Sequence, residues 1–172
     1  MATDKPLVNR IAQSGLITYK IEEFVPNVDF AFFDIKDYLF KGLILKEADF
    51  RTALKEHDWS AYEGKVLLVH CSTDAIIPMW ASMLITSYAT PVAKDVFFGK
   101  EADYYNYVLN QHIDQINPEE YQDARLVIKG CADKPIPPNI YLRLTHKLRP
   151  VAKSIMFGEP CSTVPIYKKP RK

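Results

Sequence analysis

Three cysteines are the residues of this sequence whose type and position indicate chemistry. Cys71 and Cys131 each end a run of apolar residues, and Cys161 follows a third apolar run by a few residues. Thiolates are soft ligands that suit zinc, copper(I) and iron–sulfur clusters. An odd number of cysteines without a secretory signal argues against a disulfide framework. The sequence therefore leaves metal binding, thiol chemistry and plain packing as roles for these residues.

A metal site would need more than three thiolates, because zinc is usually held by four ligands. His70, next to Cys71, is the first candidate for the fourth position. Asp74 and Asp133 follow the cysteines closely and are accessory candidates, although carboxylates are harder ligands. The predicted metal ligands are Cys71, Cys131, Cys161 and His70, with zinc, iron or an iron–sulfur cluster as the cofactor.

Two other classes of function stay open. In the first, one cysteine is the nucleophile of a thiol-based enzyme or carries a persulfide. Adjacent side chains on a strand point to opposite faces, so His70 cannot serve Cys71 as a base, whereas His146 could approach it. No residue is singled out as catalytic. In the second, the cysteines are structural, and the aromatic helix faces of a non-catalytic interaction protein make a homodimer.

An internal repeat places the first two cysteines. Segment 65–99 recurs as 125–158, and in both an apolar run ends on a cysteine. An aspartate, an Ile-Pro pair, an amphipathic stretch, the sequence Pro-Val-Ala-Lys and a second apolar run ending in Phe-Gly follow in each copy. With the preceding helix included, the repeats span 47–99 and 101–158. Each predicts a helix–strand–Cys loop–helix–strand unit.

The elements around the cysteines predict an α/β fold with a mostly parallel sheet. The runs 66–69 and 126–128 are short and apolar throughout, as in strands buried on both faces. Helices are expected at 47–57 and 101–116, and strands at 16–21 and 28–35. Ligands bind outside the carboxyl ends of strands in such sheets, so we expect the three cysteines to converge on one edge.

The helices that follow the two cysteine loops show apolar faces. In the first helix Trp80, Met83, Leu84 and Tyr88 share a predicted face, and in the second Ile140, Leu144 and Leu148 do so. The composition is that of a globular protein of one domain over 1–172. The segment 159–172 holds the third cysteine and a basic tail, which we interpret as solvated.

Charge and hydropathy exclude several classes of partner. The net charge of +1 indicates neither nucleic acid nor a membrane surface as a partner. No apolar run approaches the roughly 20 residues that span a bilayer. The first ten residues carry an acidic side chain and no apolar signal region. We therefore expect a cytoplasmic protein without nucleic-acid or membrane partners.

Several long motifs carry a resemblance to a known family. They are 33–37, 42–47, 57–60, 69–78, 129–135 and 151–167. The chain resembles a bacterial family catalogued as domain of unknown function 2480, and the match covers nearly the whole sequence. The family's motif cysteines fall on Cys71, Cys131 and Cys161, with His70 and Asp74 in the first motif. The resemblance implies no reaction. It implies a protein encoded close to the sulfur-mobilisation machinery that assembles iron–sulfur clusters, and hence iron–sulfur assembly proteins as partners. The expected function is thus a metal- or iron–sulfur-binding module accessory to cluster assembly.

Overall fold

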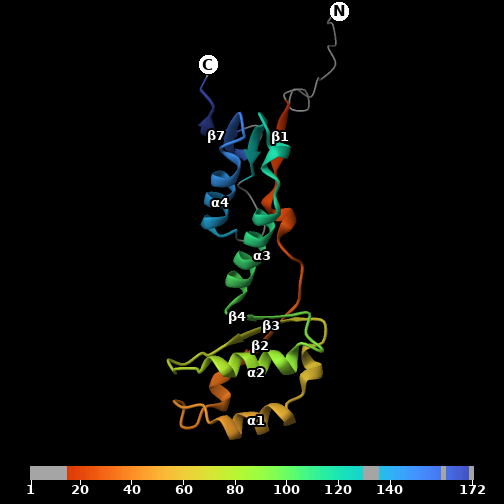
Figure 1. Ribbon diagram of the computed structural model, residues 1–172, viewed down its shortest axis with the longest axis vertical. Helices are drawn as coiled ribbons and strands as arrows, with labels where there is room; N and C mark the ends of the chain where they lie inside the picture. Colours follow the sequence, from red (N-terminus) through yellow and green to blue (C-terminus); the bar gives the residue numbers. More distant parts are fainter. Residues whose placement is uncertain (1–14, 130–135, 160–161, 171–172) are drawn as a thin grey trace, which may run out of the picture. The chain divides into compact units, whose positions relative to one another are not determined.

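The chain forms two compact units (Figure 1). The computed structural model describes residues 15–129, 136–159 and 162–170. Unit 2 is the contiguous segment Pro26–Tyr104, whereas unit 1 combines the described parts of Met1–Val25 and Tyr105–Lys172. Unit 2 is thus inserted between two pieces of unit 1. The prediction of one domain over 1–172, with repeats at 47–99 and 101–158, stays a prediction.

Unit 2 is built on a three-stranded parallel sheet. Its strands are β2 (Phe30–Asp34), β3 (Val66–His70) and β4 (Asp95–Phe98), in the order β2-β3-β4. The helices α1 (Glu47–Glu56) and α2 (Met79–Ala89) connect them, and two short 3-10 helices, η2 (Ile35–Tyr38) and η3 (Trp59–Tyr62), flank α1. Right-handed crossovers that add strands in one direction place both helices on the same face of the sheet. Figure 1 shows α1 and α2 on that one side.

Unit 1 repeats this order of elements and adds a strand. Its sheet has the order β1-β5-β6-β7, in which the first three strands are parallel and β7 is antiparallel to β6. These strands are β1 (Leu16–Tyr19), β5 (Arg125–Ile128), β6 (Ser154–Glu159) and β7 (Ser162–Lys168). The helices are α3 (Glu101–Gln115), which begins in unit 2, and α4 (Pro138–Leu148). The short 3-10 helices are η1 (Ile21–Phe24) and η4 (Pro118–Tyr121).

Each unit has its own hydrophobic core between its sheet and its helices. In unit 2, Leu67 and Val69 of β3 pack with Phe50 and Leu54 of α1 and with Ile85 of α2. The corresponding cluster in unit 1 joins strand residues to α3 and α4, and consists of Leu126, Ile128, Ile155, Leu109, Ile113, Ile140, Leu144 and Leu148, among others. The consecutive apolar residues of β3 and β5 are buried on both faces of their sheets, as an uninterrupted apolar run predicts.

The secondary structure confirms most of the sequence-based expectations. The fold is α/β and mostly parallel, with four α-helices among the described residues. The predicted helices at 47–57 and 101–116 and the strands at 66–69 and 126–128 are present. The internal repeat itself stays a prediction. No helix in the described part of the chain combines the length and apolar character that a membrane span requires.

The predicted face of α2 is correct for three of its four residues and wrong for Met83. Met83 of α2 is 71% exposed, whereas Ala81, Ile85 and Ala89 are fully buried. Trp80, Leu84 and Tyr88 pack at the edges of the core. The small alanines let α2 approach the sheet closely, so the buried stripe is centred on them rather than on the largest side chains. In α4 the predicted face is confirmed, because Ile140, Leu144 and Leu148 are all buried.

Candidate functional site

Cys71 lies at the carboxyl end of β3, as the sequence predicts. It follows the last strand residue, His70, and opens the loop that leads to α2. Its side chain is half-buried and packs against the core of unit 2. The Cys71 Sγ lies 3.3 Å from the Thr73 Oγ1. Helix α2 begins only at Met79, so the thiol does not sit directly at a helix amino terminus. Cys71 is thus a partly accessible thiol beside one hydroxyl.

Asp34 holds the start of this loop. Its Oδ1 accepts hydrogen bonds from the backbone N–H of Ser72 at 3.0 Å and of Lys36 at 3.1 Å. Its Oδ2 forms an ion pair with the Lys36 Nζ at 3.2 Å. Burial favours the protonated carboxyl, but the hydrogen bonds from Ser72 and Lys36 outweigh it, so the pKa of Asp34 is well below its usual value. The carboxylate therefore fixes the backbone next to Cys71.

His70 belongs to the opposite face of β3 from Cys71. It pairs in register with Asp34 on β2, and its Nε2 lies 3.7 Å from the Asp34 Oδ2. Its ring meets the Phe32 ring edge-on at 6.3 Å between centroids. Side chains alternate along a strand, which separates this imidazole from the core-facing thiol of Cys71. The structure thus brings His70 together with Asp34, a partner that the sequence did not indicate.

The remaining predicted ligands are not brought together by the described residues. Cys131, Asp133 and Cys161 lie outside the described ranges. Asp74 is exposed and lines a hollow of about 370 Å³. In residues 15–129, 136–159 and 162–170, no group of three His, Cys, Asp or Glu side chains could hold a metal ion. The four-ligand site of Cys71, Cys131, Cys161 and His70 stays a prediction.

The loop after Cys71 presents an apolar surface. The hollow that Asp74 lines also contacts Leu43, Ile44 and Ile76. Ile76 is 92% exposed, and Leu43 and Ile44 are 67% and 61% exposed. Large exposed apolar side chains that gather in one place typically mark a contact surface for another molecule. The loop with Cys71 therefore carries both a thiol and a patch of apolar side chains.

Two histidines are enclosed by tyrosines, a feature that sequence analysis missed. In unit 2 the His57 Nδ1 lies 3.1 Å from the Tyr38 hydroxyl and its Nε2 lies 2.7 Å from the Tyr62 hydroxyl. In unit 1 the His112 Nε2 lies 2.8 Å from the Tyr19 hydroxyl. Burial lowers the pKa of both histidines. Because hydroxyl partners and aromatic rings surround them, we assign these histidines to packing.

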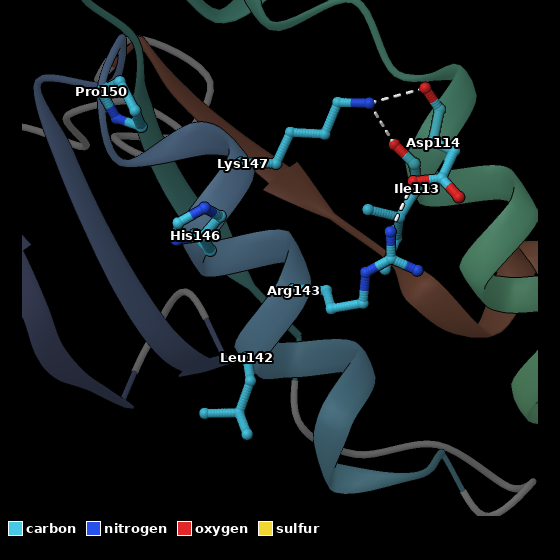
Figure 2. Close-up of a pocket in the computed structure, with 7 residues that line it drawn as sticks. All are labelled: Ile113, Asp114, Leu142, Arg143, His146, Lys147 and Pro150. Atoms are coloured by element: carbon cyan, nitrogen blue, oxygen red, sulfur yellow. Dashed lines mark hydrogen bonds and ion pairs between the residues drawn. The ribbon is translucent and has the colours of Figure 1, made fainter.

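His146, the other candidate base, lines a groove between α3 and α4 in unit 1 (Figure 2). The charged side chains of this groove are engaged with α3. Arg143 donates to Asp114 and Asn110, and the Lys147 Nζ donates to the backbone carbonyls of Ile113 and Asp114. These contacts join the two helices and cap the end of α3. The groove is therefore a structural clamp, and Cys71 belongs to the other unit.

Sequence analysis also missed the structural role of Asp34. The available signal was local: an acidic residue ends an apolar strand and precedes a short turn, and the aspartate caps that turn by accepting from the residue two positions later. Such a cap predicts a fixed strand end. It does not predict the bond to Ser72, which lies 38 residues further along the chain.

Comparison with known proteins identifies the family. A family model described as a protein of unknown function, DUF2480, matches residues 5–169. A search of curated proteins and a search of solved structures each found no match. The match spans nearly the whole sequence and confirms the resemblance in the motifs. The chain belongs to the DUF2480 family.

Proposed function

We propose that the protein is a sulfur carrier in which Cys71 holds a persulfide. The main support for this proposal is the position of the Cys71 thiol. It is partly accessible at the carboxyl end of β3, on a loop that Asp34 fixes. A carrier needs one accessible thiolate in a defined position, and it needs no adjacent base. The separation of His70 from Cys71 therefore does not count against this function.

The transfer that we propose is an exchange between sulfur atoms. The Cys71 thiolate attacks the outer sulfur of a donor hydropersulfide, R–S–SH. A new S–S bond forms on Cys71, the S–S bond of the donor breaks, and the donor leaves as the thiolate R–S⁻. The proton stays on the transferred sulfur, so the products are Cys71–S–SH and R–S⁻. No external oxidant or reductant is consumed.

Thr73 supports the reacting thiolate. Its hydroxyl lies 3.3 Å from the Cys71 Sγ and can donate a hydrogen bond to the negatively charged sulfur. Ser72, between them, is held through its backbone N–H by Asp34. The Cys71 sulfur and the Thr73 hydroxyl therefore flank a residue whose backbone is fixed before the persulfide substrate binds.

The experiment is mass spectrometry of the full chain after incubation with glutathione persulfide. We expect a gain of one sulfur atom on Cys71, absent in Cys71→Ser and retained in Cys131→Ser and Cys161→Ser. Thr73→Ala should slow the labelling about three- to tenfold, since one hydrogen bond is lost. Thr86→Ala is the matched control, because its hydroxyl donates to the Ser82 carbonyl within α2. Equal labelling of Cys71→Ser and the unsubstituted chain, or no labelling at all, would contradict the proposal.

A metal- or iron–sulfur-binding module accessory to cluster assembly is the second candidate. What favours it is that a cysteine follows the central strand of each unit in the sequence, Cys71 after β3 and Cys131 after β5. The proposed ligands are Cys71, Cys131, Cys161 and His70, and iron–sulfur assembly proteins are the proposed partners. The chain would then hold zinc or iron after anaerobic reconstitution, and each cysteine-to-serine variant would lose it. Metal-free protein after reconstitution would count against this second candidate.

The common arrangement of the units supports a duplicated origin for these loops. In each unit the order is strand, 3-10 helix, α-helix, 3-10 helix, strand, α-helix and strand. In each the strand before the second α-helix is central among the three parallel strands. We propose that the repeats 47–99 and 101–158 derive from one ancestral unit.

A dimeric interaction protein with structural cysteines is the alternative to both candidate functions. Function that survives replacement of all three cysteines by serine would favour it.

A further inference from the structure

The amino ends of the parallel strands in unit 1 meet the end of β7 along one edge of the sheet. Leu16 of β1 is in register with Arg125 of β5, and Arg125 is in register with Ser154 of β6. The antiparallel β7 brings its last residue, Lys168, opposite Ser154. Three strands thus begin and one strand ends along a single line. This edge is opposite to the carboxyl ends of β1, β5 and β6.

Positive charge gathers at this line. A pocket of about 690 Å³ is lined by Arg125, Lys153, Lys168 and Lys169, and no carboxylate is among its described lining residues. Lys169 is paired with Asp123 at 2.8 Å. No ion pair joins the other three cations to a described residue. The hydrogen bond from Lys169 lowers the pKa of Asp123, and Lys153 lies near enough for its positive charge to lower that pKa further. The pocket therefore presents three cations without an ion-pair partner in the described chain, in excess over this one nearby carboxylate.

The backbone fixes where these cations stand. The Lys153 N–H donates to the Ala124 carbonyl at 2.8 Å, and the Lys169 N–H donates to the Lys153 carbonyl at 2.9 Å. Leu126 and Ile155, the neighbours of the first residues of β5 and β6, belong to the core beneath the helices. Alternation along the strands therefore places Arg125 and Ser154 on the other face of the sheet. The register thus places Arg125 beside Ser154 and Ser154 beside Lys168, and Lys153 and Lys169 border the same pocket.

The rest of the pocket is apolar. Leu16, Met156, Pro165 and Tyr167 line it together with the hydroxyl-bearing Ser154. The volume lies within the range of small-molecule sites, and it is far larger than a single phosphate ion needs. An anion alone would leave the apolar side chains uncovered, and an apolar molecule alone would leave the cations without a partner. The lining thus fits a ligand with an anionic head and an apolar body.

We propose that this pocket binds an organic phosphate, a small molecule that joins a phosphate dianion to an apolar or aromatic body. Arginine and lysine are the side chains that most often hold phosphate, arginine through two parallel N–H donors and lysine as a point charge. Arg125 and Lys153 bind the phosphate oxygens, and Leu16 and Met156, which lie on the same face of the sheet as Arg125, cover the body. This site lies within unit 1 and does not depend on the chemistry proposed for Cys71 in unit 2.

The test is a titration of the full chain with phenyl phosphate, followed by NMR of the backbone amides. We expect saturable shifts at Arg125, Lys153 and Ser154. Inorganic phosphate, which lacks the body, and phenol, which lacks the charge, should each bind at least about tenfold more weakly. Added salt should weaken the binding of phenyl phosphate, because the cations are exposed.

Variants decide whether these cations form the site. Arg125→Gln with Lys153→Gln should weaken binding about tenfold, since each exposed charge contributes a factor of a few. The matched control is Lys65→Gln with Lys94→Gln, the repeat-equivalent positions in unit 2, which should leave the affinity unchanged. The absence of saturable binding, equal affinity for inorganic phosphate, or an equal loss in the control would overturn the proposal. Tighter binding of a single-stranded oligonucleotide that the same variant abolishes would also overturn it, in favour of nucleic acid.

Discussion

The first parallel strand of each unit runs into a short 3-10 helix, but the residue at that junction is an aspartate in unit 2 and a lysine in unit 1. Asp34 caps η2 by accepting the Lys36 N–H, and it also accepts the Ser72 N–H. Lys20, at the same place before η1, makes no side-chain cap bond. A short carboxylate reaches backbone donors on two segments, whereas a lysine has only donors to offer.

Unit 1 places its carboxylate two residues later. Glu22 in η1 pairs with the Lys129 Nζ at 2.8 Å, directly after β5. Its second oxygen, Oε2, is buried and has no hydrogen-bond partner in the described chain. The two units therefore join their first strand to the end of their central strand by different means. In unit 2, Asp34 accepts a hydrogen bond from the backbone of the loop that holds Cys71. In unit 1, Glu22 pairs with the side chain of Lys129 after the strand.

The largest expected effect comes from matched cavities in the two cores. Ile85→Ala in unit 2 and Leu144→Ala in unit 1 each remove a fully buried side chain. Each should lower the free energy of unfolding of its unit by about 2–5 kcal/mol. Both tryptophans, Trp59 and Trp80, belong to unit 2, so urea unfolding followed by fluorescence reports that unit and circular dichroism reports both. If Leu144→Ala moved the fluorescence transition as far as Ile85→Ala does, the separate cores would not act separately.

An intermediate effect is expected at the strand junctions. Asp34→Asn removes the carboxylate that binds Ser72 and Lys36, and it should lower the free energy of unfolding by about 1–3 kcal/mol. Glu22→Gln loses only the ion pair with Lys129, so it should lower the free energy of unfolding by less. Urea midpoints at neutral pH measure both.

The pH dependence of Asp34 has a definite sign. Its pKa is lowered on folding, so its contribution is present above about pH 4, the unfolded value, and is lost as the pH falls through the lower folded value. The stability difference between Asp34→Asn and the unsubstituted chain should therefore shrink as the solution is acidified below pH 4. A difference that stayed constant would mean that the carboxylate charge does not hold the loop.

The smallest expected effect concerns the two enclosed histidines. Burial lowers the pKa of His57 and of His112, so each binds a proton more readily in the unfolded chain. Their contribution to stability is thus complete above about pH 6.5, and it declines as the pH falls below that value. Ring-proton NMR titration should show both midpoints below the ordinary value for histidine. Midpoints at or above it would show that the rings are not desolvated.

The parts of the fold that could be predicted depend on neighbours in the sequence. The apolar run 66–69 and the helical spacing of 101–116 gave the right elements because each pattern lies within one segment. The position of Cys71 at a strand end followed from the same local pattern. In α2 the helical spacing found Trp80, Leu84 and Tyr88, which pack against the core, but it missed Ala81 and Ala89, which are fully buried.

Contacts between distant segments could not be read from these patterns. The bond from Ser72 to Asp34 depends on β2 and β3 being neighbours in register. The row of cations in unit 1 depends on β7 running antiparallel, which brings Lys168 to the start of β6. The sequence suggested only a solvated basic tail there. Strand order and direction are set by the packing of the whole sheet, so single-segment patterns carry no signal for them.

The insertion of unit 2 into unit 1 sets an order of events during synthesis. Strand β1 is made before unit 2, yet it pairs with β5, in which the partner of Leu16 is Arg125, more than 100 residues later. All of unit 2 is made in between, and its strands pair with near neighbours in the chain. Closing a long loop is costly in entropy and slow, so we expect unit 2 to fold on the emerging chain while β1 waits. The sheet of unit 1 is thus completed only after all of unit 2 has been made.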